Sequence, residues 1–151
     1  MRSRMRPACL AIVFAALTAC GAKDPQAGKP GASKQASSDL AVTRKLAQIA
    51  GQANGAAPAN IDENTRLDGA KAGPGLKLTT MYTLSNPEAT GITSETFETK
   101  LTPVVKDGGC KNPDLRPLID RGVVVVLEYR GVDGKPIGTV SINRDTCAAI
   151  K

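Results

Sequence analysis

Four cysteines are the residues with the greatest capacity for chemistry in this chain of 151 residues: Cys9, Cys20, Cys110 and Cys147. A thiol can be a small core residue, half of a disulfide, a metal ligand or a site of covalent modification. The chain contains no histidine, so every catalytic triad or dyad that needs an imidazole is excluded. What each thiol does therefore depends on the segments that surround it.

The first two cysteines lie in a segment with the features of an export signal. Arg2, Arg4 and Arg6 precede an uncharged, mostly apolar run of 12 residues from Ala8 to Ala19. A transmembrane helix needs about 20 apolar residues, so this run is too short to span a bilayer. It matches the apolar region of a secretory signal peptide. A buried N-terminal core helix is the alternative, but an unbroken apolar run after three arginines lacks amphipathic spacing.

The run ends in Leu17-Thr18-Ala19-Cys20, which resembles the lipobox of bacterial lipoproteins. Ala19 would also serve an ordinary signal peptidase. The resemblance covers only about the first twenty residues and says nothing about the fold that follows. It implies cleavage before Cys20, a diacylglycerol on the Cys20 thiol and acylation of the new amino group. Two or three acyl chains make a durable anchor, whereas one binds only marginally.

The residue after Cys20 is Gly21 rather than Asp. In the enterobacterial version of the lipoprotein family, Asp at this position tends to retain the protein in the inner membrane. The resemblance therefore implies the periplasmic face of the outer membrane, with the inner membrane as the alternative.

If the resemblance holds, the two remaining cysteines form a pair. Cys9 is removed with the signal peptide and Cys20 carries lipid, which leaves Cys110 and Cys147 in an oxidising compartment. We predict a disulfide between them, closing a loop of 38 residues. The chain-entropy model gives such a loop about 4 kcal/mol of stabilisation at most. A metal site is the alternative, but the chain has no C-x-x-C spacing and no histidine.

Charge and composition exclude nucleic acid as a partner. The net charge of +6 falls to about +3 when Arg2, Arg4 and Arg6 are removed. Aromatic residues make up 3% of the chain and tryptophan is absent, so no platform for stacking bases is expected. We expect no metal and no cofactor other than the lipid on Cys20.

The chain divides into three segments: a lipoprotein signal peptide at 1–19, a lipidated cysteine with a flexible tether at 20–37, and one periplasmic α+β domain at 38–151. The tether is rich in Gly, Ala, Pro, Ser and Lys, which favours disorder. In the domain we expect a helix that starts at Ser37 or Ser38, followed by two strands, two helices and two strands. This order predicts an antiparallel sheet of about four strands with helices on one face.

Spacing and turn residues delimit these elements. Val42, Leu46, Ile49 and Ala53 share one face of the first helix, and a partner-binding amphipathic helix is the alternative. Strands are predicted around 64–71, at 76–85, at 123–130 and at 136–143. In the second helix, capped by Thr93 or Ser94, Pro103 should cause a kink and Gly108-Gly109 should end it. Asn112 caps the third helix, which ends at Gly122, and Asp133-Gly134 turns the last hairpin.

Several charged residues are candidates for a catalytic, metal-binding or attachment site. Asp62, Glu63 and Asp68 are predicted to be solvent-facing rather than an acid/base pair or a calcium loop. Arg116, Asp120 and Arg121 should form exposed ion pairs. In some outer-membrane lipoproteins a terminal lysine is joined to peptidoglycan, and this chain resembles them in its terminal Lys151. Only four residues follow Cys147, so the reach of that lysine is short.

The favoured hypothesis is a non-catalytic lipoprotein whose domain binds, or assists the assembly of, another envelope protein; no binding residue is nominated. One alternative is an inhibitor or immunity-type protein that presents the loop at 86–94 to a lytic enzyme or toxin. An enzyme acting on cell wall or lipid is the least favoured, because the sequence contains no P-loop, G-x-S-x-G, S-x-x-K or G-x-G-x-x-G motif.

Overall fold

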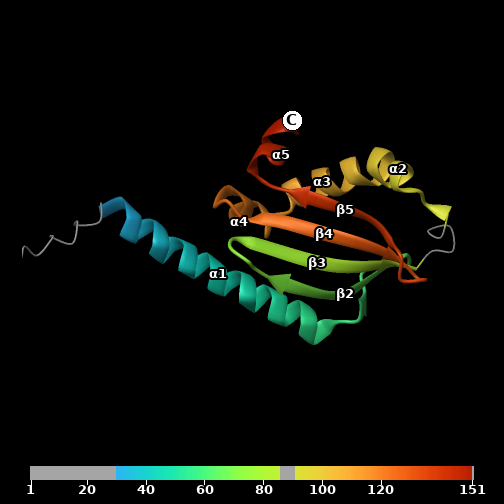
Figure 1. Ribbon diagram of the computed structural model, residues 1–151, viewed down its shortest axis with the longest axis horizontal. Helices are drawn as coiled ribbons and strands as arrows, with labels where there is room; N and C mark the ends of the chain where they lie inside the picture. Colours follow the sequence, from blue (N-terminus) through green and yellow to red (C-terminus); the bar gives the residue numbers. More distant parts are fainter. Residues whose placement is uncertain (1–29, 86–90, 151) are drawn as a thin grey trace, which may run out of the picture.

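The computed structural model describes residues 30–85 and 91–150 as one α+β domain (Figure 1), which confirms the predicted fold class. The elements follow one another along the chain as α1 (Pro30–Ala56), β1 (Ala59–Asn60), β2 (Thr65–Ala72), β3 (Lys77–Leu84), α2 (Ser94–Thr96), the π-helical turn η2 (Phe97–Leu101), α3 (Thr102–Lys111), α4 (Arg116–Asp120), β4 (Val124–Gly131), β5 (Pro136–Ile142) and α5 (Arg144–Ala149).

The strands form one sheet in the order β1-β2-β3-β4-β5. All neighbouring pairs are antiparallel except β3 and β4, which run parallel with Lys77 opposite Val124 and Leu84 opposite Gly131. The prediction of about four purely antiparallel strands was therefore wrong at the centre of the sheet. The chain leaves β3 through α2, η2, α3 and α4 and returns to the end where β3 began, and such a helical crossover makes its two strands parallel.

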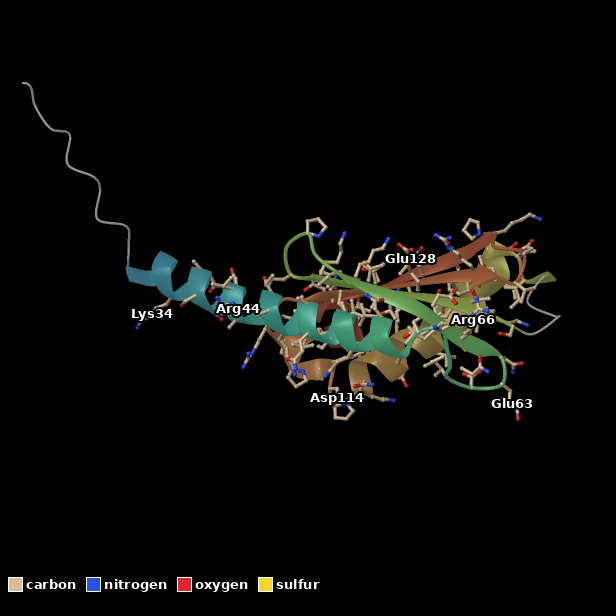
Figure 2. The ribbon with its side chains drawn as sticks, turned by 90° about the horizontal axis from the view of Figure 1, so that it is seen from below. Lys34, Arg44, Glu63, Arg66, Asp114 and Glu128 are labelled. Atoms are coloured by element: carbon tan, nitrogen blue, oxygen red, sulfur yellow. A yellow bond between two sulfur atoms is a disulfide. The ribbon has the colours of Figure 1, made fainter. Side chains whose placement is uncertain are left out.

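One face of the sheet carries the helices, and the other, on which Glu128 lies, is open (Figure 2). Helix α1 contacts β2 and β3, while α3 contacts β5. Val42, Leu46 and Ala50 of α1 are buried, as the predicted helical face requires. Ile49 and Ala53 of the same helix are only partly buried, because they lie beside the contact with the sheet rather than within it.

Helix α1 starts earlier than predicted. It begins at Pro30, eight residues before Ser38, so residues 30–37 of the expected tether are helical; residues 20–29 lie outside the described part of the chain. Proline is favoured in the first turn of a helix, where its missing N–H costs no hydrogen bond. With 27 residues the helix is about 40 Å long, and its first turns project beyond the sheet (Figure 1).

The far end of α1 closes an edge of the sheet. The Asn54 side chain donates to the carbonyl of Ala70 at 3.0 Å and accepts from the Ala70 N–H at 2.8 Å. This amide thus supplies the two hydrogen bonds that a neighbouring strand would otherwise provide to β2. A free strand edge invites pairing with other chains, so Asn54 protects the edge as well as orienting α1.

The second helical region is longer than predicted, although Thr93 caps it as expected. A π-helical turn precedes Pro103, and within it the Thr102 N–H donates to the Phe97 carbonyl, five residues back. The turn takes up the irregularity that was expected as a kink at Pro103. Gly108 and Gly109 do not end the helix, which continues to Lys111; at Gly109 a Cβ would overlap the Ile142 side chain.

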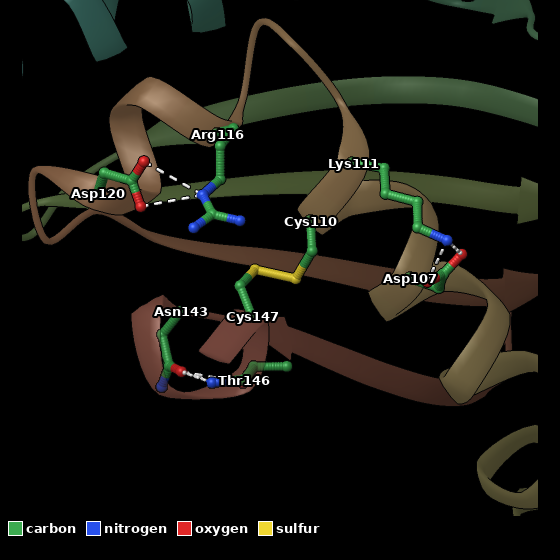
Figure 3. The surroundings of a disulfide bond; sticks show 8 residues. All are labelled: Asp107, Cys110, Lys111, Arg116, Asp120, Asn143, Thr146 and Cys147. Carbon is green, nitrogen blue, oxygen red and sulfur yellow. Dashed lines mark hydrogen bonds and ion pairs between the residues drawn. A yellow bond between two sulfur atoms is a disulfide. The ribbon is translucent and has the colours of Figure 1, made fainter. Parts of the chain in front are cut away.

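The predicted disulfide between Cys110 and Cys147 is present (Figure 3). It joins the end of α3 to α5 with a Cα–Cα distance of 5.3 Å, and both cysteines are buried. Helix α5 was not predicted. Its start is held by Asn143, whose side-chain oxygen accepts from the Thr146 N–H at 2.8 Å. This cap is what turns the chain after β5 and brings Cys147 back to α3.

Gly138 in β5 permits a close approach between η2 and the sheet. The Phe97 ring, which is 1% exposed, occupies the position that a Cβ on residue 138 would take. Gly108 in α3, by contrast, has no atom within 4 Å of such a Cβ. Alanine substitution at these two glycines therefore compares a tightly packed position with an open one.

We expect Gly138→Ala to lower the free energy of unfolding by about 1–3 kcal/mol, because the buried Phe97 ring must move to admit the methyl group. Gly108→Ala should raise it by up to about 1 kcal/mol, because alanine loses less backbone entropy in a helix. Urea denaturation of both variants measures the two changes. Equal effects would contradict the tight contact at Gly138.

Candidate functional site

A groove of ≈ 660 Å³ lies between α1 and the segment 114–121 that contains α4. Its apolar part consists of Ile49 from α1 with Leu115, Pro117 and Leu118 from the opposite side. Leu118 is buried, whereas Ile49 and Leu115 remain half-buried. Partly exposed aliphatic side chains in a concave surface are typical of a site that accepts apolar groups.

Four exposed polar side chains surround this apolar surface: Lys45 and Gln52 from α1, and Asp114 and Arg121 from the other side. Neither Lys45 nor Arg121 forms an ion pair with another residue in the described ranges. Arg116 and Asp120 pair with each other at 3.0 Å on the exposed side of α4, as predicted, whereas the ion pair predicted for Arg121 was wrong within the described ranges. The groove therefore offers two cations and one carboxylate to a ligand, around an aliphatic centre.

Local sequence positions both walls of the groove. Lys45, Ile49 and Gln52 are spaced by four and three residues, so they share a helical face beside the buried one. On the opposite wall, the side-chain oxygen of Asn112 accepts from the backbone N–H groups of Asp114 and Leu115 at 2.9 and 3.1 Å. Asn112 thus holds the turn at 113–115 that leads into the helix, whereas α4 itself begins only at Arg116, with Leu115 and not Asn112 at its N-cap position.

The groove is lined by aliphatic, amide and charged side chains. Its eight described lining residues include no serine, threonine, tyrosine or cysteine, and hence no side-chain hydroxyl or thiol that could act as a nucleophile. Among residues 30–85 and 91–150, no group of three or more His, Cys, Asp or Glu side chains is placed to hold a metal ion. No helix in these ranges has both the length and the apolar composition to cross a membrane.

The acidic residues weighed from the sequence are not brought together into a catalytic pair. Asp62 and Glu63 are exposed in the connection between β1 and β2. Asp68 is instead held on the sheet, where it accepts from Thr83 at 2.5 Å and pairs with Arg66 at 2.7 Å. Partial burial raises the pKa of Asp68, but the hydrogen bonds from Thr83 and Arg66 outweigh it and leave that pKa below its ordinary value.

An aromatic cluster was not anticipated. Tyr82 and Tyr129 stack with ring centroids 5.4 Å apart, and Phe97 lies 5.3 Å from Tyr129. Tyr82 and Tyr129 occupy equivalent positions on β3 and β4, so the cluster depends on the parallel pairing that the sequence did not reveal. Burial, with smaller effects of Tyr82 and Asp62, raises the pKa of Tyr129 to about 12.

We expect the free energy of unfolding to fall at alkaline pH, when the buried Tyr129 ionises. The folded-state pKa of Tyr129 lies above its unfolded value, so the contribution is complete below pH ~10 and is lost as the pH rises towards 12. Ultraviolet titration of the phenolates, compared between the native protein and Tyr129→Phe, isolates this group. A Tyr129 pKa near 10 would contradict the buried environment.

Three residues or segments weighed from the sequence fall outside the described ranges: the lipobox cysteine Cys20, the terminal Lys151, and residues 86–90 of the loop assigned to an inhibitor function. The predictions made for them stay predictions. The groove could not be predicted from the sequence. Ile49, an aliphatic residue of the first helix that the sheet does not fully bury, is the feature of the sequence that relates to it.

No protein-family model matches the chain, and no curated protein sequence does. Three solved structures resemble it. A putative secreted protein from Pseudomonas aeruginosa is 19% identical with a TM-score of 0.62, over 72% of this chain and 95% of that one. The pilotin EpsS of the Vibrio vulnificus type 2 secretion system is 14% identical with a TM-score of 0.59, over 77% and 96%. The type II secretion system pilotin AspS of Vibrio cholerae is 16% identical with a TM-score of 0.57, over 79% and 100%. At these identities the likeness establishes that the chain shares its fold with two pilotins and a secreted protein.

Proposed function

We propose that this protein is a non-catalytic envelope lipoprotein whose groove between α1 and α4 binds a segment of another envelope protein during its assembly. Cys20 carries the lipid, and the domain lies at the periplasmic face of the outer membrane. The observation that carries the proposal is the groove, because half-buried Ile49 and Leu115 lie together there in a concave surface with Pro117 and Leu118.

The fold supports the class of partner. Two of the three similar structures are pilotins of type II secretion systems, and the present chain spans nearly the whole of each. We therefore assign the partner to the components of such a system in the same cell. This shared fold supports the proposal that the domain binds a partner and does not catalyse a reaction, which is the role favoured from the sequence.

The chemistry of the groove describes the segment it would bind. A volume of ≈ 660 Å³ falls within the range of sites that bury a small ligand or several side chains. Aliphatic side chains of the partner would fill the space between Ile49 and Leu115, and a carboxylate beside them would meet Lys45 or Arg121. In such interfaces a few central apolar contacts carry most of the affinity, while the surrounding charges set orientation and association rate.

The groove can be tested by placing a charge in its apolar centre. Leu115→Glu and Ile49→Glu should each weaken binding of the partner roughly tenfold or more, since an unpaired carboxylate would then face the partner's apolar side chains. Val104→Glu is the matched control, because Val104 is 69% exposed on α3, outside the groove lining. The measurement is quantitative capture of type II secretion components from solubilised envelopes by each variant. Undiminished capture by both groove variants would refute this assignment of the site.

The anchor can be tested through the two cysteines that lie upstream of the domain. Mass spectrometry of the protein from membranes should show a chain that begins at Cys20 and carries a diacylglycerol and an acyl group. Cys20→Ser should abolish the lipid, and Cys9→Ser should not, because Cys9 lies in the segment that is removed. A mature chain of native Cys20 with no added lipid mass would contradict the proposed attachment.

A further inference from the structure

Charge is distributed unevenly along the long axis of the domain. The N-terminal half of α1, the tip of the β2–β3 hairpin, α4 and the start of α5 lie at one end of the sheet (Figures 1 and 2). Two hydrogen bonds link parts of this end: the Val124 N–H at the start of β4 donates to Leu76 O at the hairpin tip at 2.9 Å, and the Arg144 guanidinium of α5 donates to Asp120 O of α4. These elements therefore present one continuous surface.

This end, called the basic end below, has a surplus of positive charge. Its exposed basic side chains that form no ion pair within the described part of the chain are Lys34, Arg44, Lys45, Lys71, Arg121 and Arg144. Among residues 30–85 and 91–150, the carboxylates that accompany them outside the Arg116–Asp120 and Lys111–Asp107 pairs are Asp39, Asp114 and Asp145.

The opposite end has the opposite surplus. Asp62, Glu63, Asp68, Glu95 and Asp133 lie there, with Arg66, Arg130 and Lys135 as the basic residues. Figure 2 places Lys34 and Arg44 at one extremity of the described domain and Glu63 at the other. The domain thus has a charge dipole along its long axis, and an anionic surface would orient it with the basic end inward.

The N-terminus emerges at the basic end. Helix α1 begins there at Pro30, and nine residues, 21–29, separate the helix from the proposed attachment at Cys20, which makes ten residue steps from Cys20 to Pro30. Even fully extended, ten residues span only about 35 Å. An anchor at Cys20 therefore keeps the basic end, rather than the acidic end, near the lipid headgroups.

We infer that the basic end contacts an anionic phospholipid surface and holds the domain upright, with its acidic end directed away from the membrane. Each exposed cation near such a surface changes the partition coefficient by about fivefold, and the effect decays within a Debye length of about 10 Å. The contact is weak alone but sufficient for a protein already held at the membrane, where its effective concentration is high. The lipid anchor contributes only by keeping the domain close to the membrane. The surface can therefore be tested with protein that lacks the anchor.

The test uses unlipidated chain 20–151, which retains the whole core, since every buried core residue lies between Val42 and Cys147. Co-sedimentation at low ionic strength compares vesicles of phosphatidylcholine with vesicles that also contain phosphatidylglycerol. We expect binding only to the anionic vesicles, and loss of that binding when salt is added. Equal binding to both vesicle types, or no binding to either, would overturn the inference.

A matched pair of triple variants locates the surface. Lys34→Gln, Arg44→Gln and Lys71→Gln together remove three charges from the basic end and leave Lys45 and Arg121 of the groove intact. Lys100→Gln, Arg130→Gln and Lys135→Gln remove three charges elsewhere. The first triple should weaken vesicle binding roughly tenfold or more and the second less than about threefold. Equal losses would mean that net charge alone drives binding and would overturn the inference, provided that thermal unfolding shows both variants folded.

Discussion

The structure depends on covering one face of a five-stranded sheet with helices drawn from distant parts of the chain. Helix α1 lies over β2 and β3, while η2 and α3 lie over β5. Burial of that apolar face is the main source of stability for a domain of this kind. Helix α4 reaches only one end of the layer, so Ile49 and Leu115 stay half-buried, and the groove results from this incomplete coverage.

Close contacts over β5, on the same helix-covered face, keep that arrangement rigid. Gly138 admits the Phe97 ring and Gly109 admits the Ile142 side chain, which brings η2 and α3 down onto β5. The disulfide between Cys110 and Cys147 then fixes α3 to α5. Because α4 follows α3 directly, the same contacts also set the wall of the groove that carries Leu115. The core and the groove are therefore parts of one packing arrangement.

Local features of this fold could be predicted from the sequence, and most long-range ones could not. The turn at Asp133-Gly134 and the Asn112 side-chain bonds follow from residue types and their immediate neighbours. The pairing of Cys110 with Cys147 is long-range, but it could be predicted because the lipoprotein resemblance leaves only these two cysteines to pair. The parallel pairing of β3 with β4 depends on the path of a crossover 39 residues long, between Leu84 and Val124. The helix end predicted at Gly108-Gly109 was wrong because Gly109 serves close packing against Ile142 rather than helix termination. The groove joins Ile49 to Leu115, two residues whose proximity no local pattern encodes.

The central claim is that the groove between α1 and α4 holds an envelope protein in the cell. Site-specific photo-crosslinking in living cells tests this most directly, with the photoreactive residue at Gln52 beside the groove or, as the control, at Val104 on α3. The account predicts a crosslink from Gln52 to a component of the type II secretion system, and none to it from Val104. No crosslink from Gln52, or the same products from both positions, would contradict it.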